Sequence, residues 1–106
     1  MKAFQGGTVH VANEVIDIII ALTAVRVDNV VAVKGYDDVK NRLHRNYKSH
    51  IKTVVDDRYL TTDLTILVDM QRPIIEIVEE VQDKIRQQVE SMLGLQCGEV
   101  NITVAG

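Results

Sequence analysis

The sequence predicts an α+β fold, a two-layer sandwich in which two helices pack on one face of a five-stranded mixed sheet. Apolar residues recur at helical spacing in two segments, residues 13–26 and 73–93. Short stretches typical of strands precede, separate and follow these segments. Because two helices can cover only one face of such a sheet, the strands should alternate apolar and polar residues, and most of them do.

The first half of the chain predicts a strand, a helix and a second strand. Residues 7–12 alternate apolar and polar side chains, the period of a half-buried strand. The helical spacing that begins at residue 13 predicts a helix with its N-cap at Ala12 or Asn13. Asp28 and Asn29 then mark a turn, and the apolar run 30–33 predicts the second strand.

A β-hairpin is expected in the middle of the chain. Residues 50–57 and 61–70 have the composition of strands and flank the sequence Arg-Tyr-Leu, with the bend near Asp56 and Asp57. No Asn-Gly or Asp-Gly pair specifies the turn, so the register of this hairpin stays open.

The strongest helical signal covers residues 73–93. Pro73 suits the first helical position, one apolar stripe runs along the segment, and Gly94 is a natural C-terminal stop. A last strand is expected over residues 99–106. The predicted order is therefore β-α-β-β-β-α-β, with two right-handed helical crossovers that each link parallel strands.

Alternation assigns the strand side chains to two faces. The face toward the helices should carry Val9, Val11, Leu64, Ile66, Val68, Val100, Ile102 and Val104. The other should carry Thr8, His10, Asp63, Thr65, Leu67, Glu99, Asn101 and Thr103. This second face is polar without being strongly charged, which makes it a candidate surface for self-association or for a partner protein.

Length and composition indicate one domain over residues 1–106, with a basic loop at about residues 36–50. Aromatic residues make up only 4% of the chain, which leaves little material for an aromatic ligand pocket. The longest apolar run is far shorter than a membrane span, no signal-peptide pattern opens the chain, and Cys97 is the single cysteine. We therefore expect a cytoplasmic protein without a transmembrane segment.

No catalytic, cofactor-binding or metal-binding residues are predicted. Gly-rich phosphate motifs between a strand and a helix are absent, and His10, His44 and His50 lack the spacing of a metal site. The strongest acid–base arrangement is His10 near Asp63 or Glu99, but an open sheet face favours a solvated histidine instead. Cys97 is expected to be a small core residue rather than a nucleophile.

The candidate interaction surface is a basic segment, residues 40–52, which carries five Lys or Arg side chains and no acidic one. The residues before it sum to −2 and those after it to −6, so its charge of +5 stands out in a chain of net charge −3. The candidate contacts are Lys40, Arg42, Arg45, Tyr47, Lys48 and Lys52. A solvated or partner-facing loop ranks first, a lipid-facing segment second, and a nucleic-acid site third, because only one aromatic side chain accompanies the cations.

Two long segments resemble the alkaline shock protein family, the envelope stress response proteins of Gram-positive bacteria. They are "GTVHVANEVIDIIIALTAVRVDNVVAV" near the start and "DLTILVDMQRPIIEIVEEVQDKIRQQVESMLGLQCGEVNITVAG" at the end. Matching positions are Gly7, Glu14-Val15-Ile16, Pro73-Ile74, Gly94-Leu95 and the final strand Val100 to Val104. The chain departs from the family pattern at Asn13, where members often have Pro, and at Asn29, where they often have Gly; residues 35–60 match least.

The resemblance implies a non-enzymatic cytoplasmic protein linked to cell-envelope homeostasis and alkaline stress. It also implies a position near the membrane through a membrane-anchored protein partner, and no catalytic residues. We therefore expect a self-associating scaffold or adaptor that acts through protein–protein contacts. The alternative is a small nucleic-acid-binding module that uses residues 40–52.

Overall fold

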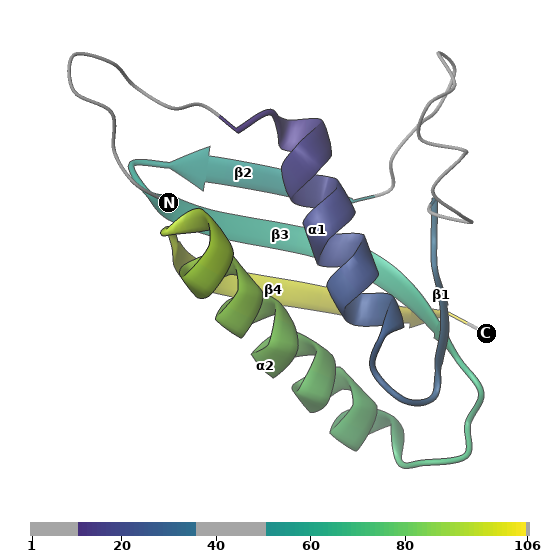
Figure 1. Cartoon of the computed structure of the whole chain (residues 1–106). Helices are drawn as coiled ribbons and strands as arrows, with labels where there is room; N and C mark the ends of the chain where they lie inside the picture. Colours follow the sequence, from purple (N-terminus) through teal and green to yellow (C-terminus); the bar gives the residue numbers. More distant parts are fainter. Residues whose placement is uncertain (1–10, 36–50, 106) are drawn as a thin grey trace, which may run out of the picture.

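The computed structural model describes residues 11–35 and 51–105 (Figure 1). In these ranges, four strands form one sheet and both helices lie on the same face of it (Figure 1). The elements are α1 (Asn13–Val25), β1 (Val30–Val33), β2 (Lys52–Asp56), β3 (Tyr59–Val68), α2 (Ile74–Leu93) and β4 (Gln96–Ala105). The predicted α+β class with two helices is thus confirmed, whereas the count of five strands is not. The strand expected at residues 7–12 falls mostly outside the described ranges, and its last two residues, Val11 and Ala12, are not in a strand.

β3 is the centre of the sheet. β4 runs parallel to it along one edge, with Leu64 opposite Ile102 and Ile66 opposite Val104. Both β1 and β2 run antiparallel to β3 along the other edge. β1 lies opposite the C-terminal end of β3 and β2 opposite its N-terminal end, so these two short strands share one edge.

The parallel pairing of β3 with β4 confirms the crossover expected through the second helix. The first predicted crossover needs a partner strand at residues 7–12, which lies mostly outside the described ranges. The partner that the structure shows for β1 is β3, and the pairing is antiparallel.

The hairpin turn between β2 and β3 consists of two residues, Asp57 and Arg58. Both have positive φ angles, 48° and 72°, the left-handed backbone that a tight two-residue hairpin requires. The bend was predicted close by but the turn type was not, because Arg58 stands where an Asp-Gly turn has Gly.

α2 is well described by its sequence pattern. Ile77, Val81, Ile85 and Val89 are fully buried along one stripe, and Gly94 caps the helix in the left-handed conformation with φ 66°. Pro73 takes the N-cap position rather than the first helical position.

β4 begins at Gln96, three residues before the start predicted for it. The pairing register with β3 shifts here, so that Cys97 lies opposite Leu60 and Val100 opposite Thr62. This β-bulge adds a residue to β4 and breaks the alternation by which a strand is recognised in a sequence.

The core lies between the sheet and the helices. Every second residue of β3 faces it, and Leu60, Thr62, Leu64, Ile66 and Val68 are all buried. The predicted inward placement of Leu64, Ile66, Val68 and Val100 is confirmed, while Ile102 and Val104 are only partly buried. Asp63, Glu99, Asn101 and Thr103 are exposed as predicted.

Candidate interaction surfaces

The side of the sheet away from the helices is an accessible face built from the alternate residues of β2, β3 and β4. We call it the open face and define it by Lys52, Val54, Asp56, Tyr59, Thr61, Asp63, Thr65, Leu67, Glu99, Asn101 and Thr103. Val54 and Tyr59 expose 63% and 53% of their surface. The charged members of this set are Lys52, Asp56, Asp63 and Glu99, so most members of the open face are uncharged and some are apolar.

One polar row crosses the open face. Lys52 of β2 and Asn101 of β4 flank Asp63 of β3 in the strand register. The amide nitrogen Nδ2 of Asn101 donates a hydrogen bond of 2.7 Å to Oδ1 of Asp63. The carboxylate of Asp63 is therefore held by a neutral neighbour on one side and lies opposite a cation on the other.

Of the six candidate contact residues in the basic segment, the structure describes one, Lys52, which is exposed at the start of β2. The other five lie outside the described ranges, namely Lys40, Arg42, Arg45, Tyr47 and Lys48. The same holds for His10, His44 and His50. The arrangement of His10 near Asp63 therefore stays a prediction.

The structure places the chain just before and just after residues 36–50. The backbone N–H of Lys34 donates to the carbonyl of Thr65 at 2.8 Å, and Lys52 lies opposite Asp63. Thr65 and Asp63 are two residues apart along β3. The chain therefore leaves the β1–β2 edge of the sheet and returns to almost the same point of that edge.

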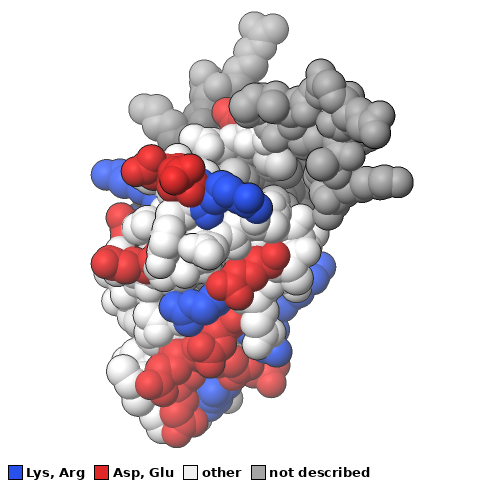
Figure 2. Space-filling view, turned by 90° about the vertical axis from the view of Figure 1, so that its left-hand side faces the viewer, with Lys and Arg blue, Asp and Glu red and all other residues white. Residues whose placement is uncertain are grey.

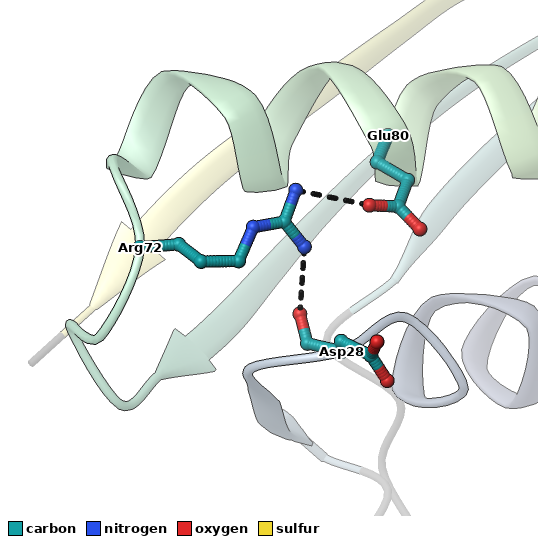
Figure 3. Close-up of polar contacts among 3 residues, drawn as sticks. All are labelled: Asp28, Arg72 and Glu80. Carbon is teal, nitrogen blue, oxygen red and sulfur yellow. Dashed lines mark hydrogen bonds and ion pairs between the residues drawn. The ribbon is translucent and has the colours of Figure 1, made fainter.

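A second surface lies between the two helices. Nη2 of Arg72 pairs with Oε1 of Glu80 at 3.0 Å, and Nη1 donates to the backbone carbonyl of Asp28 at 3.4 Å (Figure 3). One guanidinium thus ties the start of α2 to the turn after α1. A groove of about 270 Å³ is lined by Thr23, Arg26, Val27, Glu80, Lys84 and Gln88.

Charges of both signs lie on the side of the molecule shown in Figure 2, which is turned by 90° from the view that shows both helices. Acidic side chains gather toward the lower end of this view, with basic ones among them. Charges of both signs are typical of a solvated surface. The open face is more neutral and is the stronger candidate for a protein contact.

A buried polar chain links α1 to the sheet. Asp17 of α1 is buried, and its Oδ1 has no hydrogen-bond partner among the described residues. Burial raises the pKa of the Asp17 carboxyl, a hydrogen bond from the Thr53 side chain lowers it, and Glu14 raises it. The Oγ1 atoms of Thr53 and Thr62 are 3.0 Å apart. Either of these two hydroxyls could be the donor.

The lone cysteine has the environment of a packing residue. Cys97 is partly buried against the core, and this burial raises the pKa of its thiol, although Arg86 lowers it. A thiol with a raised pKa is mostly protonated near neutrality and reacts slowly as a nucleophile. Within residues 11–35 and 51–105, no three His, Cys, Asp or Glu side chains come together as metal ligands.

Sequence reasoning missed the two apolar residues that give the open face its character, Val54 and Tyr59. The period of two in β3 could have been followed back from Asp63 through Thr61 to Tyr59, which lie on the same side of the strand. Val54 needed the hairpin register, which depends on the Asp57–Arg58 turn. In the described part of the chain, no helix has the length and hydropathy of a membrane span.

Comparison with known proteins gives a family match along almost the whole chain. The model of the alkaline shock protein family, described as having a cell envelope-related function, matches residues 2–106. Two proteins of Bacillus subtilis (strain 168), both described as uncharacterized, are similar to the chain. YqhY is 31% identical over 103 residues, which cover 94% of this chain and 76% of YqhY. YloU is 26% identical over 105 residues, which cover 94% of this chain and 88% of YloU.

Solved structures show that the fold occurs elsewhere. A structure titled MamM-CTD 215-293 superposes with a TM-score of 0.56 at 15% identity and covers 90% of this chain and 99% of its own. A nickel form of a MamM CTD variant gives 0.54 at 14% identity, with 88% and 96% covered. At such identities the likeness concerns the fold alone.

Proposed function

The chain belongs to the alkaline shock protein family, a family of cell envelope-related function, and on this premise we propose that it is a scaffold or adaptor domain of the cell envelope. In this proposal it is a non-enzymatic cytoplasmic protein that works through protein–protein contacts. A membrane-anchored protein holds it close to the membrane, and its role belongs to the response to envelope stress. The family supports the envelope setting, and the surfaces of the chain support the adaptor role.

The observation that carries the adaptor role is the composition of the open face. Protein interfaces are poor in charge at their centre and rich in aromatic side chains. Tyr59 and Val54 are both more than half exposed there, and threonines lie beside them. Asp63 already accepts a hydrogen bond from Asn101 and lies opposite Lys52. A partner could therefore cover the middle of this face at a small cost in desolvated charge.

The basic segment supplies a second contact in this proposal. Its charge of +5 lies in a chain that is otherwise acidic, and its last residue, Lys52, lies at the β1–β2 edge of the sheet. Lys40, Arg42, Arg45, Lys48 and Lys52, with Tyr47 among them, would attract an acidic surface of the partner protein. Electrostatic contacts of this type mainly raise the rate of association and fix the orientation of the partner.

Fractionation of cells that carry tagged variants tests the adaptor role. We expect the chain to sediment with the membrane, and Val54→Glu to move it to the soluble fraction, because the new charge would be buried against the partner. The matched control is Gln87→Glu, which adds the same charge on an exposed position of α2 and should leave the distribution unchanged. Soluble behaviour of the wild-type chain under envelope stress, or no effect of Val54→Glu, would contradict the proposal.

The second candidate function is nucleic-acid binding by residues 40–52. It is favoured by the run of cations without an acidic residue and by Tyr47, which would stack on a base. A salt titration of RNA and DNA binding decides it, because binding by five cations must weaken steeply as salt increases. Affinity at low salt that is lost when Lys40, Arg42, Arg45 and Lys48 are changed to Glu would support this function, and absence of binding at low salt would exclude it.

A further inference from the structure

The edge of β4 that faces away from β3 has no strand partner within the described part of the chain. β4 has ten residues, which is long for an edge strand, and Glu99 is its one charged side chain. It contains no Pro, Lys or Arg. Unpaired backbone groups along such a strand are a template for another strand, and proteins usually protect such edges with charge, Pro, bulges or short strands.

The opposite side of the sheet has these protections. β1 and β2 contain four and five residues, and residues 34–51 interrupt them. Lys34 and Lys52 stand where the interruption begins and ends. In β4 the bulge at Gly98 and Glu99 affects the start of the strand, which leaves the stretch from Val100 to Ala105 regular.

The core is incompletely covered beside β4. Leu64 and Ile66 of β3 expose 2% and 0% of their surface, yet Ile102 and Val104, their neighbours in β4, are only partly buried. All four face the helices. An additional strand along β4 would cover the two partly exposed side chains and pair the free backbone groups in one step.

The flank of α2 above this edge carries apolar side chains toward its N-terminal end, whereas Gln82 and Arg86 farther along are polar or charged. Nε2 of Gln82 donates to the carbonyl of Val100 at 3.0 Å, which shows that this flank of α2 looks toward β4. Ile75 lies seven residues earlier, hence on the same flank, and exposes 66% of its surface. Val78, at the intermediate position, is partly exposed. Ile75 and Val78 thus extend the apolar surface of Ile102 and Val104 at one end of the β4 edge.

We propose that a second copy of the chain occupies this edge, with the two β4 strands paired antiparallel about a two-fold axis. The two sheets become one continuous sheet, and the two α2 helices lie side by side on the same face. The apolar surface that contains Ile75, Ile102 and Val104 then meets its own copy and leaves water. This inference rests on the proposed scaffold function and gives it the surface through which copies associate.

Charge is compatible with this pairing. In an antiparallel pair related by a two-fold axis, Glu99 faces its own copy only when the axis passes through residue 99. When the axis passes at residue 100, 101 or 102, Glu99 faces Asn101, Thr103 or Ala105 of the second copy. None of these residues is charged, so the single charge of the strand does not oppose association.

Sedimentation analysis of the full chain over a range of concentrations tests the proposal. Thr103→Glu puts a second negative charge on the edge close to Glu99 of the other copy, and Ile75→Glu puts one on the helix flank. We expect either change to raise the dissociation constant of the dimer at least about tenfold. Val54→Glu, the matched control on the open face, should leave the constant unchanged. All three substitutions replace exposed side chains, so thermal melts should show folded variants.

The possible outcomes of these experiments separate the edge pairing from the adaptor function. A monomeric wild-type chain, or a dimer unaffected by Thr103→Glu and Ile75→Glu, overturns the edge pairing. A dimer broken by Val54→Glu alone moves self-association to the open face and also overturns it. Membrane recruitment of a chain that stays monomeric would leave the adaptor function in place without this inference. A dimer of the predicted kind that is never recruited to the membrane would support the edge pairing and contradict the adaptor function.

Discussion

The two edges of β3 carry strands of very different kinds. On one edge, β1 and β2 are short, antiparallel and separated by residues 34–51. On the other edge, β4 runs parallel to β3 as a single strand of ten residues. The first edge closes the sheet with two short strands, with Lys34 just after β1 and Lys52 at the start of β2, whereas the second leaves a long, nearly uncharged strand. One side of the sheet is therefore protected against further pairing and the other is suited to it.

Truncating one side chain at the centre of the sheet and one at the β4 edge compares how well the core is covered at these two places. Ile66→Ala should lower the free energy of unfolding by about 3 kcal/mol, because Ile66 is fully buried between both edges and a cavity would remain. Ile102→Ala should cost about 1 kcal/mol in the monomer, since Ile102 is already partly exposed. Urea unfolding at low protein concentration measures both. Equal losses would show that the core is as well covered beside β4 as at its centre.

The start of β4 offers a second test. A Cβ atom at Gly98 would lie 2.9 Å from the Tyr59 ring atoms Cδ1 and Cε1 and 3.2 Å from the carbonyl oxygen of Leu60. Gly98→Ala should therefore lower the free energy of unfolding by about 1 to 2 kcal/mol through overpacking. Tyr59→Ala removes the closer contact, so the double variant should lose less than the sum of the two single variants. Strict additivity in this double-mutant cycle would contradict the close approach of the ring to β4.

The β2 side offers a test that depends on pH. Burial raises the pKa of Asp17 above its ordinary value of 3.8, so the folded chain holds this proton more tightly than the unfolded chain. The stability that this tighter proton binding gives the fold is fully present below pH 3.8 and is lost as the pH rises through the pKa of the folded state. Asp17→Asn should remove this loss and stabilise the fold by about 1 kcal/mol at neutral pH, because the amide has no ionised form that burial disfavours. Thermal melts of both chains from acid to neutral pH measure it; parallel curves for the two chains would refute the assignment.

Local elements were predictable where one physical signal governs them. The boundaries of α2 follow from the stripe of Ile77, Val81, Ile85 and Val89 and from Gly94, whose left-handed conformation ends the helix. The inner face of β3 follows from its period of two. The turn at Asp57 and Arg58 did not, because both residues adopt positive φ angles without the Gly or Asn by which such turns are recognised.

Pairing and surfaces were less predictable. An apolar run such as Val30 to Val33 identifies a strand but carries no information about its neighbour, and here that neighbour is β3, which follows β2 in the chain. The start of β4 was not predicted either, because the bulge at Gly98 depends on the pairing with β3 and not on the sequence of β4 alone. A polar sheet face was predicted as a candidate interaction surface, but the position of Val54 on it could be known only from the register of the hairpin. The partial exposure of Ile102 and Val104 depends on the position of α2 over the sheet, and no local sequence pattern specifies that position.

Backbone amide hydrogen exchange, measured at low and at high protein concentration, tests the contrast between the two edges most directly. Exchange reports whether an amide is protected by pairing, and a new strand partner adds protection at the interface beyond the general slowing that dimer formation gives to amides that exchange through global unfolding. If β4 is the edge that a second copy occupies, exchange in the stretch Val100 to Ala105 slows more than exchange in β2 as the concentration increases. Exchange in β4 that does not depend on concentration, or a change confined to β2, would contradict the account.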